Sequence, residues 1–209
     1  MMKKIGIMGG TFNPIHNGHI KIALAAYEQY ALNQVLFLPN RKPPHKKNTA
    51  IASNQARLEM ISLAISPYPF FSISNSEMKR DGFSYTCDTL LELKEKESDA
   101  DLYFIIGADS LHDMEHWYRP EQIFQLAYIL CAPRYPNTKE EDHICRKRLI
   151  SKYKASVDFI QMEPLAIASR EIVGAIQYGK SIEGKVPKTV ERYLMEHNVY
   201  PFIKERVRI

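Results

Sequence analysis

Short apolar runs alternate with longer amphipathic segments along almost the whole of this chain, and this alternation limits the folds open to it. Several runs, such as residues 34–38 (QVLFL) and 102–106 (LYFII), are continuously apolar, which is typical of strands buried on both faces of a parallel sheet. Strands are predicted at residues 3–8, 34–38, 70–74, 102–106, 127–132 and 157–161. Helices are predicted at residues 18–31, 53–65, 86–97, 120–126, 139–154, 169–178 and 188–198. This repetition predicts an α/β fold, doubly wound around a mostly parallel sheet with helices on both faces.

The composition is that of a folded globular protein. The chain has 209 residues, of which 45% are hydrophobic and 25% charged, so a largely disordered protein is excluded. Its length predicts one domain, residues 1–209, with a small helical portion from about residue 165 onward. No apolar run reaches the ~18 residues of a membrane span, and we expect no membrane partner. The net charge of +4 suits anionic small molecules; it is weak evidence for nucleic acid, which we do not expect as a partner.

The cysteines indicate the cellular compartment. Cys87, Cys131 and Cys145 are odd in number and form no C-x-x-C pair, so neither a disulfide framework nor a zinc knuckle is indicated. The N-terminal apolar stretch is too short and too rich in glycine for a signal peptide. We therefore expect a cytoplasmic protein with ordinary buried thiols.

The strongest functional signal directly follows the first predicted strand. It is the run Gly9-Gly10-Thr11-Phe12-Asn13-Pro14-Ile15-His16-Asn17-Gly18-His19. Glycines let backbone N–H groups approach an anion, and ligands of open α/β sheets sit beyond the carboxyl ends of the strands. His16 and His19 fall on one face of the first helical turn, and Gly18 between them leaves room for a ligand. Two such imidazoles can stabilise charge on a phosphoryl group, and the run is not a Walker A loop because it lacks G-K-[ST].

A basic loop follows the second predicted strand. Residues 39–51 include two adjacent prolines, which exclude a regular helix. Lys42, His45 and Lys46 in this loop can reach phosphates if it borders the site, whereas the simpler alternative is a solvated charged loop.

Two further stretches carry groups suited to a nucleotide with an aromatic base. Ser84 or Thr86 can cap the helix that follows, and the N–H groups of that helix start can hold a carboxylate. At the end of the strand at 102–106, Gly107 admits a ligand and Asp109 can accept hydrogen bonds from ribose hydroxyls. Trp117 offers an aromatic face on which a planar ring could stack. The alternatives are a plain helix cap and a core tryptophan.

Together these runs resemble a known family. The pattern Gly-x-Phe-x-Pro-x-His-x-Gly-His resembles the signature of the nucleotidylyltransferase superfamily, and PPHK, SYTxDT and IGxDS…WY are more specific to its bacterial nicotinate-nucleotide adenylyltransferase family. The resemblance runs from about residue 3 to residue 200. It implies a Rossmann-like fold and an enzyme that joins nicotinate mononucleotide to the AMP part of ATP. The implied products are deamido-NAD and pyrophosphate, made by direct in-line displacement with Mg²⁺ accompanying ATP.

The resemblance also implies residue roles. His16 and His19 are the implied catalytic residues, and nicotinate mononucleotide is held by Thr86, Asp109, Trp117 and Tyr118. The implied ATP-binding residues are Gly9, Gly10, Thr11, Phe12, Gly18, Lys42, His45, Lys46, Gly107, Ser169 and Arg170. No dedicated cluster of protein ligands for the metal is expected, because Mg²⁺ keeps several waters and leans on the nucleotide.

The sequence departs from the family pattern at Ile-Ser-Ser-Thr-x-Ile-Arg near the C-terminus. Ser169 matches the second serine, but the first serine is Ala168, the threonine is Arg170 and the arginine is Val173. Arg170 lies one helical turn before Val173, and we hypothesise that it replaces the lost guanidinium. Asn13 stands where an aspartate is commoner, and its neutral side chain can still cap a turn.

Several alternatives remain beside this interpretation. A superfamily enzyme acting on nicotinamide mononucleotide or phosphopantetheine is one, and an inactive nucleotide-binding module is another. The run His112-Asp113-Met114-Glu115-His116 matches a zinc peptidase pattern, but surface or core histidines explain it better. The sequence leaves the oligomeric state open and allows a homo-oligomer.

Overall fold

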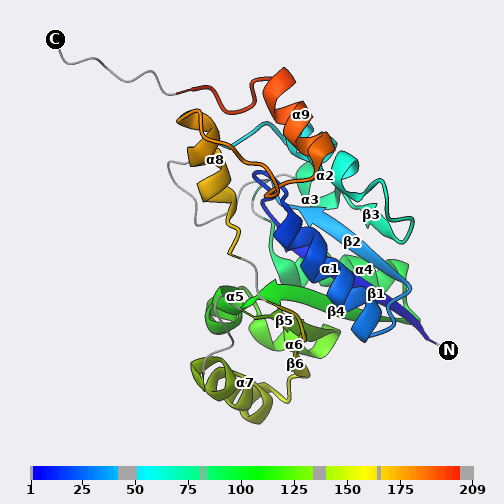
Figure 1. The fold of residues 1–209 in the computed structure, drawn as a ribbon. Helices are drawn as coiled ribbons and strands as arrows, with labels where there is room; N and C mark the ends of the chain where they lie inside the picture. Colours follow the sequence, from blue (N-terminus) through cyan, green and yellow to red (C-terminus); the bar gives the residue numbers. More distant parts are fainter. Residues whose placement is uncertain are drawn as a thin grey trace.

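The computed structural model describes residues 2–41, 51–80, 82, 84–133, 140–163 and 166–202. At its centre lies a six-stranded sheet in the order β3-β2-β1-β4-β5-β6, with every neighbouring pair parallel (Figure 1). The strands are β1 (Lys3–Gly10), β2 (Gln34–Pro39), β3 (Phe71–Ile73), β4 (Ala100–Gly107), β5 (Ala127–Ala132) and β6 (Val157–Phe159). The predicted doubly wound α/β fold is confirmed.

All seven predicted helices are present, together with three short ones that were not predicted. The helices are α1 (Asn17–Gln29), α2 (Asn54–Ile65), α3 (Ser76–Lys79), α4 (Thr86–Lys96), α5 (Ala108–Asp113), η1 (Met114–His116), α6 (Pro120–Leu126), α7 (Glu140–Tyr153), α8 (Ser169–Gln177) and α9 (Lys188–Glu196). The unpredicted α3, α5 and η1 are two turns or shorter, so an apolar period cannot reveal them. No helix among the described residues is long and apolar enough to cross a membrane.

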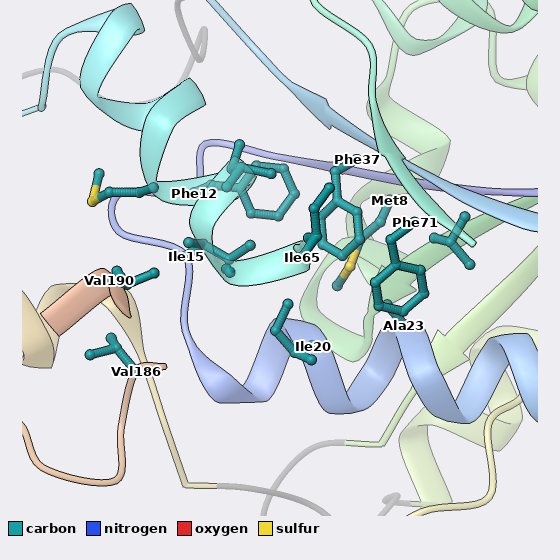
Figure 2. Packing of buried hydrophobic residues seen from close by; sticks show 14 of the residues in the cluster. Met8, Phe12, Ile15, Ile20, Ala23, Phe37, Ile65, Phe71, Val186 and Val190 are labelled. Atoms are coloured by element: carbon teal, nitrogen blue, oxygen red, sulfur yellow. The ribbon is translucent and has the colours of Figure 1, made fainter. Parts of the chain in front are cut away.

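The sheet separates two hydrophobic cores because successive side chains of a strand point to opposite faces. Ile5 and Ile7 of β1 belong to one core, which α4, α5, α6 and α7 cover. Met8 belongs to the other core, which α1, α2, α8 and α9 cover. In this second core, Ile20 and Ala23 of α1 point toward the rings of Phe37 and Phe71 (Figure 2). Burial of each large side chain in these cores stabilises the fold by about 1.5–3 kcal/mol.

The C-terminal segment packs against the first half of the chain. Val186 and Val190 enter the core beside Ile15 (Figure 2). The buried Tyr200 hydroxyl donates a 2.7 Å hydrogen bond to Oδ1 of Asn13, in the loop after β1. The last helix and the segment after it therefore support the loop that carries the strongest sequence motif.

Candidate active site

The predicted site lies where the strand order reverses direction, between the carboxyl ends of β1 and β4. β1 ends at Gly10 and β4 at Gly107, and the two strands are direct neighbours with Met8 opposite Ile105. In doubly wound sheets this switch point is where ligands bind. A Cβ atom at Gly107 would meet no atom of the described residues within 4 Å, so open space adjoins this glycine. That this space admits a ligand stays a prediction.

His16 and His19 form a reciprocal pair at the start of α1. The backbone N–H of His19 donates to Nδ1 of His16 at 3.3 Å, and the backbone N–H of His16 donates to Nδ1 of His19 at 3.2 Å. Their rings stack with centroids 3.7 Å apart and an interplanar angle of 21°. Because each Nδ1 accepts a hydrogen bond, each neutral ring carries its proton on Nε2 and can donate it to a ligand.

Burial keeps His16 neutral. Its side chain is 7% exposed, and this desolvation lowers its pKa to about 4. At neutral pH the imidazole is therefore a hydrogen-bond donor without a full charge. Such a donor suits the stabilisation of charge that develops on a phosphoryl oxygen.

The Phe12 ring packs against His19 of the histidine pair. Its ring contacts His19 edge-on, with centroids 5.0 Å apart, and lies 5.7 Å from the Phe37 ring. Phe12 is 2% exposed and has a left-handed φ of 47°, which bulky residues rarely adopt. The strained turn therefore places this aromatic ring in the core, and only the backbone of Phe12 is left to approach a ligand.

The structure corrects the reason for Gly18. A Cβ atom at this position would lie 2.9 Å from Nδ1 and 3.0 Å from Cε1 of His16. The glycine thus makes room for the His16 ring, whereas the sequence suggested that it makes room for a ligand directly.

The start of α8 lies against the same loop. The Ser169 hydroxyl donates a 3.0 Å hydrogen bond to the carbonyl oxygen of Pro14, and the N-cap residue Ala168 provides no side-chain cap. Arg170 is exposed, whereas Val173 packs against the core. The two side chains are one turn apart as predicted, but only Arg170 is accessible to an anion.

The start of α4 differs from the prediction in its cap. The N-cap residue is Tyr85, not Ser84 or Thr86, and its side chain makes no capping bond. Thr86 is already helical, and the Ser84 hydroxyl donates to the carbonyl oxygen of Glu77 at 3.4 Å. Thr89 also donates to the buried Glu77 carboxyl, at 2.8 Å, so Glu77 and not a local cap fixes the start of this helix.

The SYTxDT and WY stretches meet in space. The Tyr85 and Tyr118 rings lie 4.6 Å apart, and the Arg119 guanidinium lies 4.9 Å from the Tyr118 ring. Trp117 is half-buried, with its ring edge-on to Phe104 at 6.1 Å. The two stretches that the sequence assigned to the nicotinate side therefore form one wall.

Comparisons with known proteins agree with this geometry. The cytidylyltransferase-like family model matches residues 7–174. A "Probable nicotinate-nucleotide adenylyltransferase" of Lachnoclostridium phytofermentans is 43% identical over 201 residues, covering 95% of this chain and 100% of that protein. The chain belongs to the nicotinate-nucleotide adenylyltransferase family. A relative of the same name from Carboxydothermus hydrogenoformans is 40% identical over 197 residues, covering 94% of this chain and 98% of that protein.

Solved structures show the same fold at lower identity. Plasmodium falciparum nicotinic acid mononucleotide adenylyltransferase, complexed with APC, matches with a TM-score of 0.76 at 19% identity. The same enzyme complexed with NaAD matches with a TM-score of 0.77 at 20% identity. Each match covers 96% of this chain and 98% of the other.

The remaining predicted site residues lie at the ends of β1 and β4 or outside the described part of the chain. Gly9 closes the exposed end of β1 with Gly10, and Thr11 begins the loop after it. Asp109 is exposed in the first turn of α5, at the end of β4. Lys42, His45 and Lys46 lie outside the described residues.

The run from His112 to His116, which matches a zinc peptidase pattern, makes contacts between helices. His112 bonds Asp142 of α7 at 2.7 Å, and Glu115 pairs with Arg148 at 2.7 Å and with Lys152 at 3.1 Å. These contacts tie α5 and η1 to α7. No group of three or more potential metal ligands occurs among the described histidines, cysteines and acidic residues.

Sequence reasoning missed one residue that borders the site. Arg57 of α2 is fully buried and donates to backbone carbonyls of the loops that follow β1 and β2. A signal was present, because residue 57 shares the helix face of the core residues Met60, Ile61 and Ala64. A charged residue in such a position needs polar partners inside the protein.

Proposed function

We propose that this protein transfers the AMP part of ATP to nicotinate mononucleotide, giving deamido-NAD and pyrophosphate. The single observation that carries the proposal is the stacked His16–His19 pair at the β1–β4 switch point. The names of relatives at 40% and 43% identity support the choice of substrates.

The reaction is one in-line displacement. An oxygen of the nicotinate mononucleotide phosphate forms a bond to the α-phosphorus of ATP, and the bond from that phosphorus to the β-bridging oxygen breaks. Pyrophosphate leaves with the electron pair. The attacking phosphate is already an anion, so no general base is needed and the protein contributes alignment and charge stabilisation.

The described residues divide this work. His16 and His19 donate from Nε2 to the α-phosphate as its negative charge shifts in the transition state. Backbone N–H groups from Gly9, at the end of β1, to Phe12, in the loop after it, approach the triphosphate. Ser169 holds the start of α8 against that loop, and the exposed Arg170 interacts with the outer phosphates. The sequence adds Lys42, His45 and Lys46 to this task.

The wall formed by the start of α4 and the residues just after η1 binds the nicotinate side. The N–H groups of Thr86 and Tyr118 hold the carboxylate, and the partial positive charge at the start of α4 favours that anion. Trp117 stacks on the pyridine ring and Asp109 accepts hydrogen bonds from the ribose. Phosphopantetheine has neither an aromatic ring nor a carboxylate for this wall, which makes it the weaker candidate.

Mg²⁺ fits this site as a companion of ATP. The site offers imidazole and backbone N–H donors, and the described residues contain no group of three or more potential metal ligands. Mg²⁺ would therefore be held mainly by the phosphate oxygens of ATP and by water. When bound, it neutralises charge on the departing pyrophosphate. The three buried free cysteines support a cytoplasmic location.

The experiment is product identification with ATP labelled in the α-phosphate. The account expects the label in a dinucleotide and unlabelled pyrophosphate in equal amounts. Label released as AMP, or no turnover despite ATP binding, would contradict it; the second result would indicate an inactive nucleotide-binding module.

A further inference from the structure

Arg57 is a buried cation whose guanidinium contacts both loops of the proposed phosphate site. It projects from α2 (Asn54–Ile65) and is 0% exposed. Its Nη1 donates to the carbonyl oxygen of Thr11 at 2.8 Å and to that of Asn40 at 2.7 Å. Its Nη2 donates to Oδ1 of Asn54 at 2.7 Å and lies 3.4 Å from the carbonyl oxygen of Arg41.

These acceptors belong to different loops. Thr11 follows β1, whereas Asn40 and Arg41 follow β2 and lead into the basic stretch of the sequence. One guanidinium nitrogen thus joins the two loops, and the N–H of Asn40 adds a 3.0 Å bond to the carbonyl oxygen of Gly10. The planar guanidinium makes this bridge possible, because it presents several donors in a fixed geometry.

The charge of Arg57 has no acidic partner in the part of the chain that the structure describes. Its described acceptors are three backbone carbonyls and the neutral amide of Asn54. Buried charges are ordinarily paired with an opposite charge. Burial lowers the pKa of the guanidinium, yet arginine remains protonated at neutral pH. The positive charge therefore remains available to an anion at the adjoining loop.

The hydrogen bonding around Arg57 is not the arrangement that would give the folded protein its highest stability. Arg57 Nε and Asn40 Oδ1 are buried and have no hydrogen-bond partner among the described residues. Each such atom carries a desolvation cost that a purely structural contact would avoid. A role in binding gives a reason for keeping a cation here.

We infer that Arg57 is a positioning residue for the triphosphate: it fixes the loops after β1 and β2 relative to each other and places an uncompensated positive charge behind them. The inference rests on the proposed adenylyl transfer. Arg57 does not touch the substrate; it acts through the Thr11 and Asn40 backbones and through its field.

The sharpest test changes Asn54, whose side chain bonds Arg57 at the first position of α2. Asn54→Asp keeps the shape and the acceptor and gives Arg57 a carboxylate partner. A merely structural Arg57 would gain or keep stability with unchanged ATP affinity. The inference predicts an unchanged or raised melting temperature together with ATP binding about tenfold weaker by calorimetry, an effect that shrinks as salt is added. Asn54→Ala is the matched control and leaves ATP affinity within about threefold, since it adds no charge.

Two variants of Arg57 separate the effect of its charge from the effect of its hydrogen bonds to both loops. Arg57→Lys keeps the charge but cannot span both loops, and we expect KM for ATP to rise about tenfold while KM for nicotinate mononucleotide stays nearly constant. Arg57→Met removes both functions, with a fall of about 100-fold in kcat/KM for ATP.

The outcomes distinguish this inference from the function on which it rests. A wild-type protein without pyrophosphate release refutes the proposed function, and ATP calorimetry still tests Arg57. If wild type is active and Asn54→Asp binds ATP as tightly as Asn54→Ala, the inference is wrong. If Arg57→Met does not fold, the Asn54 pair decides the question alone.

Discussion

His16 and His19 each hold the other's ring by a backbone N–H bond to Nδ1, at 3.3 and 3.2 Å. The two imidazoles are therefore one structural unit, and the same contacts cap α1. The rings also stack, so a substitution of either side chain removes a packing partner of the other ring, and their contributions to catalysis are not independent.

The first prediction concerns this unit. His19→Ala lowers kcat about 100–1000-fold because a transition-state donor is lost and the His16 ring loses the ring on which it stacks. His16→Ala has a similar effect, and the double variant loses far less than the product of the two. Steady-state kinetics with ATP and nicotinate mononucleotide measure all three. A decrease below about threefold for His19→Ala would contradict the assignment.

The second prediction concerns acid stability. The pKa of His16 is about 4 in the folded protein and about 6.5 when unfolded, so only the unfolded state binds its proton between these values. The stability contributed by neutral His16 is fully present above pH ~6.5 and is lost as pH falls to ~4. This pKa difference corresponds to roughly 3 kcal/mol.

Urea unfolding at pH 7 and pH 4.5 measures this effect. His16→Asn is the control, because asparagine is a good N-cap residue but does not titrate. Wild type should lose about 2–3 kcal/mol more than this variant on acidification. Equal losses would show that His16 is accessible to protons in the folded state.

The third prediction compares two helical glycines. Gly18→Ala pushes a methyl group into the His16 ring, 2.9 Å from Nδ1, and should lower kcat about tenfold or more. Gly174→Ala in α8 meets no atom within 4 Å and should stabilise the protein by about 0.5–1 kcal/mol with unchanged kinetics. Thermal unfolding and kcat together check both. Normal turnover in Gly18→Ala would remove the steric explanation.

The fourth prediction concerns the nicotinate wall. Trp117→Ala removes the proposed stacking partner, and we expect KM for nicotinate mononucleotide to rise about tenfold with little change in KM for ATP. Tyr178→Ala, at an aromatic residue that is 61% exposed, is the control and should behave as wild type. An equal rise in both KM values for Trp117→Ala would indicate general disruption of the site.

The fifth prediction concerns the altered motif at α8. Arg170→Ala should raise KM for ATP about tenfold, because Arg170 is exposed beside a helix start that Ser169 anchors to Pro14. Arg192→Ala, at an exposed residue of α9, is the control for loss of one surface charge. If Arg170→Ala leaves KM and kcat unchanged, Arg170 does not replace the guanidinium missing at Val173.

Local patterns predicted most of the fold and the juxtaposition of His16 and His19. The buried strands were visible as continuous apolar runs, and the His16–His19 spacing placed both rings on one helical turn. The prediction for Gly18 did not include its contact with the His16 ring, and the predicted capping residue of α4 was wrong. Both features depend on where neighbouring side chains lie. Gly18 adjoins the His16 ring, and Glu77 anchors α4 through Ser84 and Thr89.

Local sequence patterns could not predict the contacts between segments that are distant in the chain. Tyr200 and Asn13 are 187 residues apart, and only the packing of α9 and the segment after it brings them together. Arg57 could be noticed as a charge on an apolar helix face, but its acceptors are backbone carbonyls that no side-chain pattern reveals.

Pyrophosphate release with ATP and Mg²⁺, compared in parallel for nicotinate mononucleotide, nicotinamide mononucleotide and phosphopantetheine, decides whether this protein makes deamido-NAD. The account predicts turnover with a clear preference for the nicotinate substrate, because the start of α4 favours its carboxylate and Trp117 its ring. Preference for the amide or for phosphopantetheine would contradict the assigned pocket. No release with any of the three would mean that the changed residues at the start of α8 have cost the protein its activity.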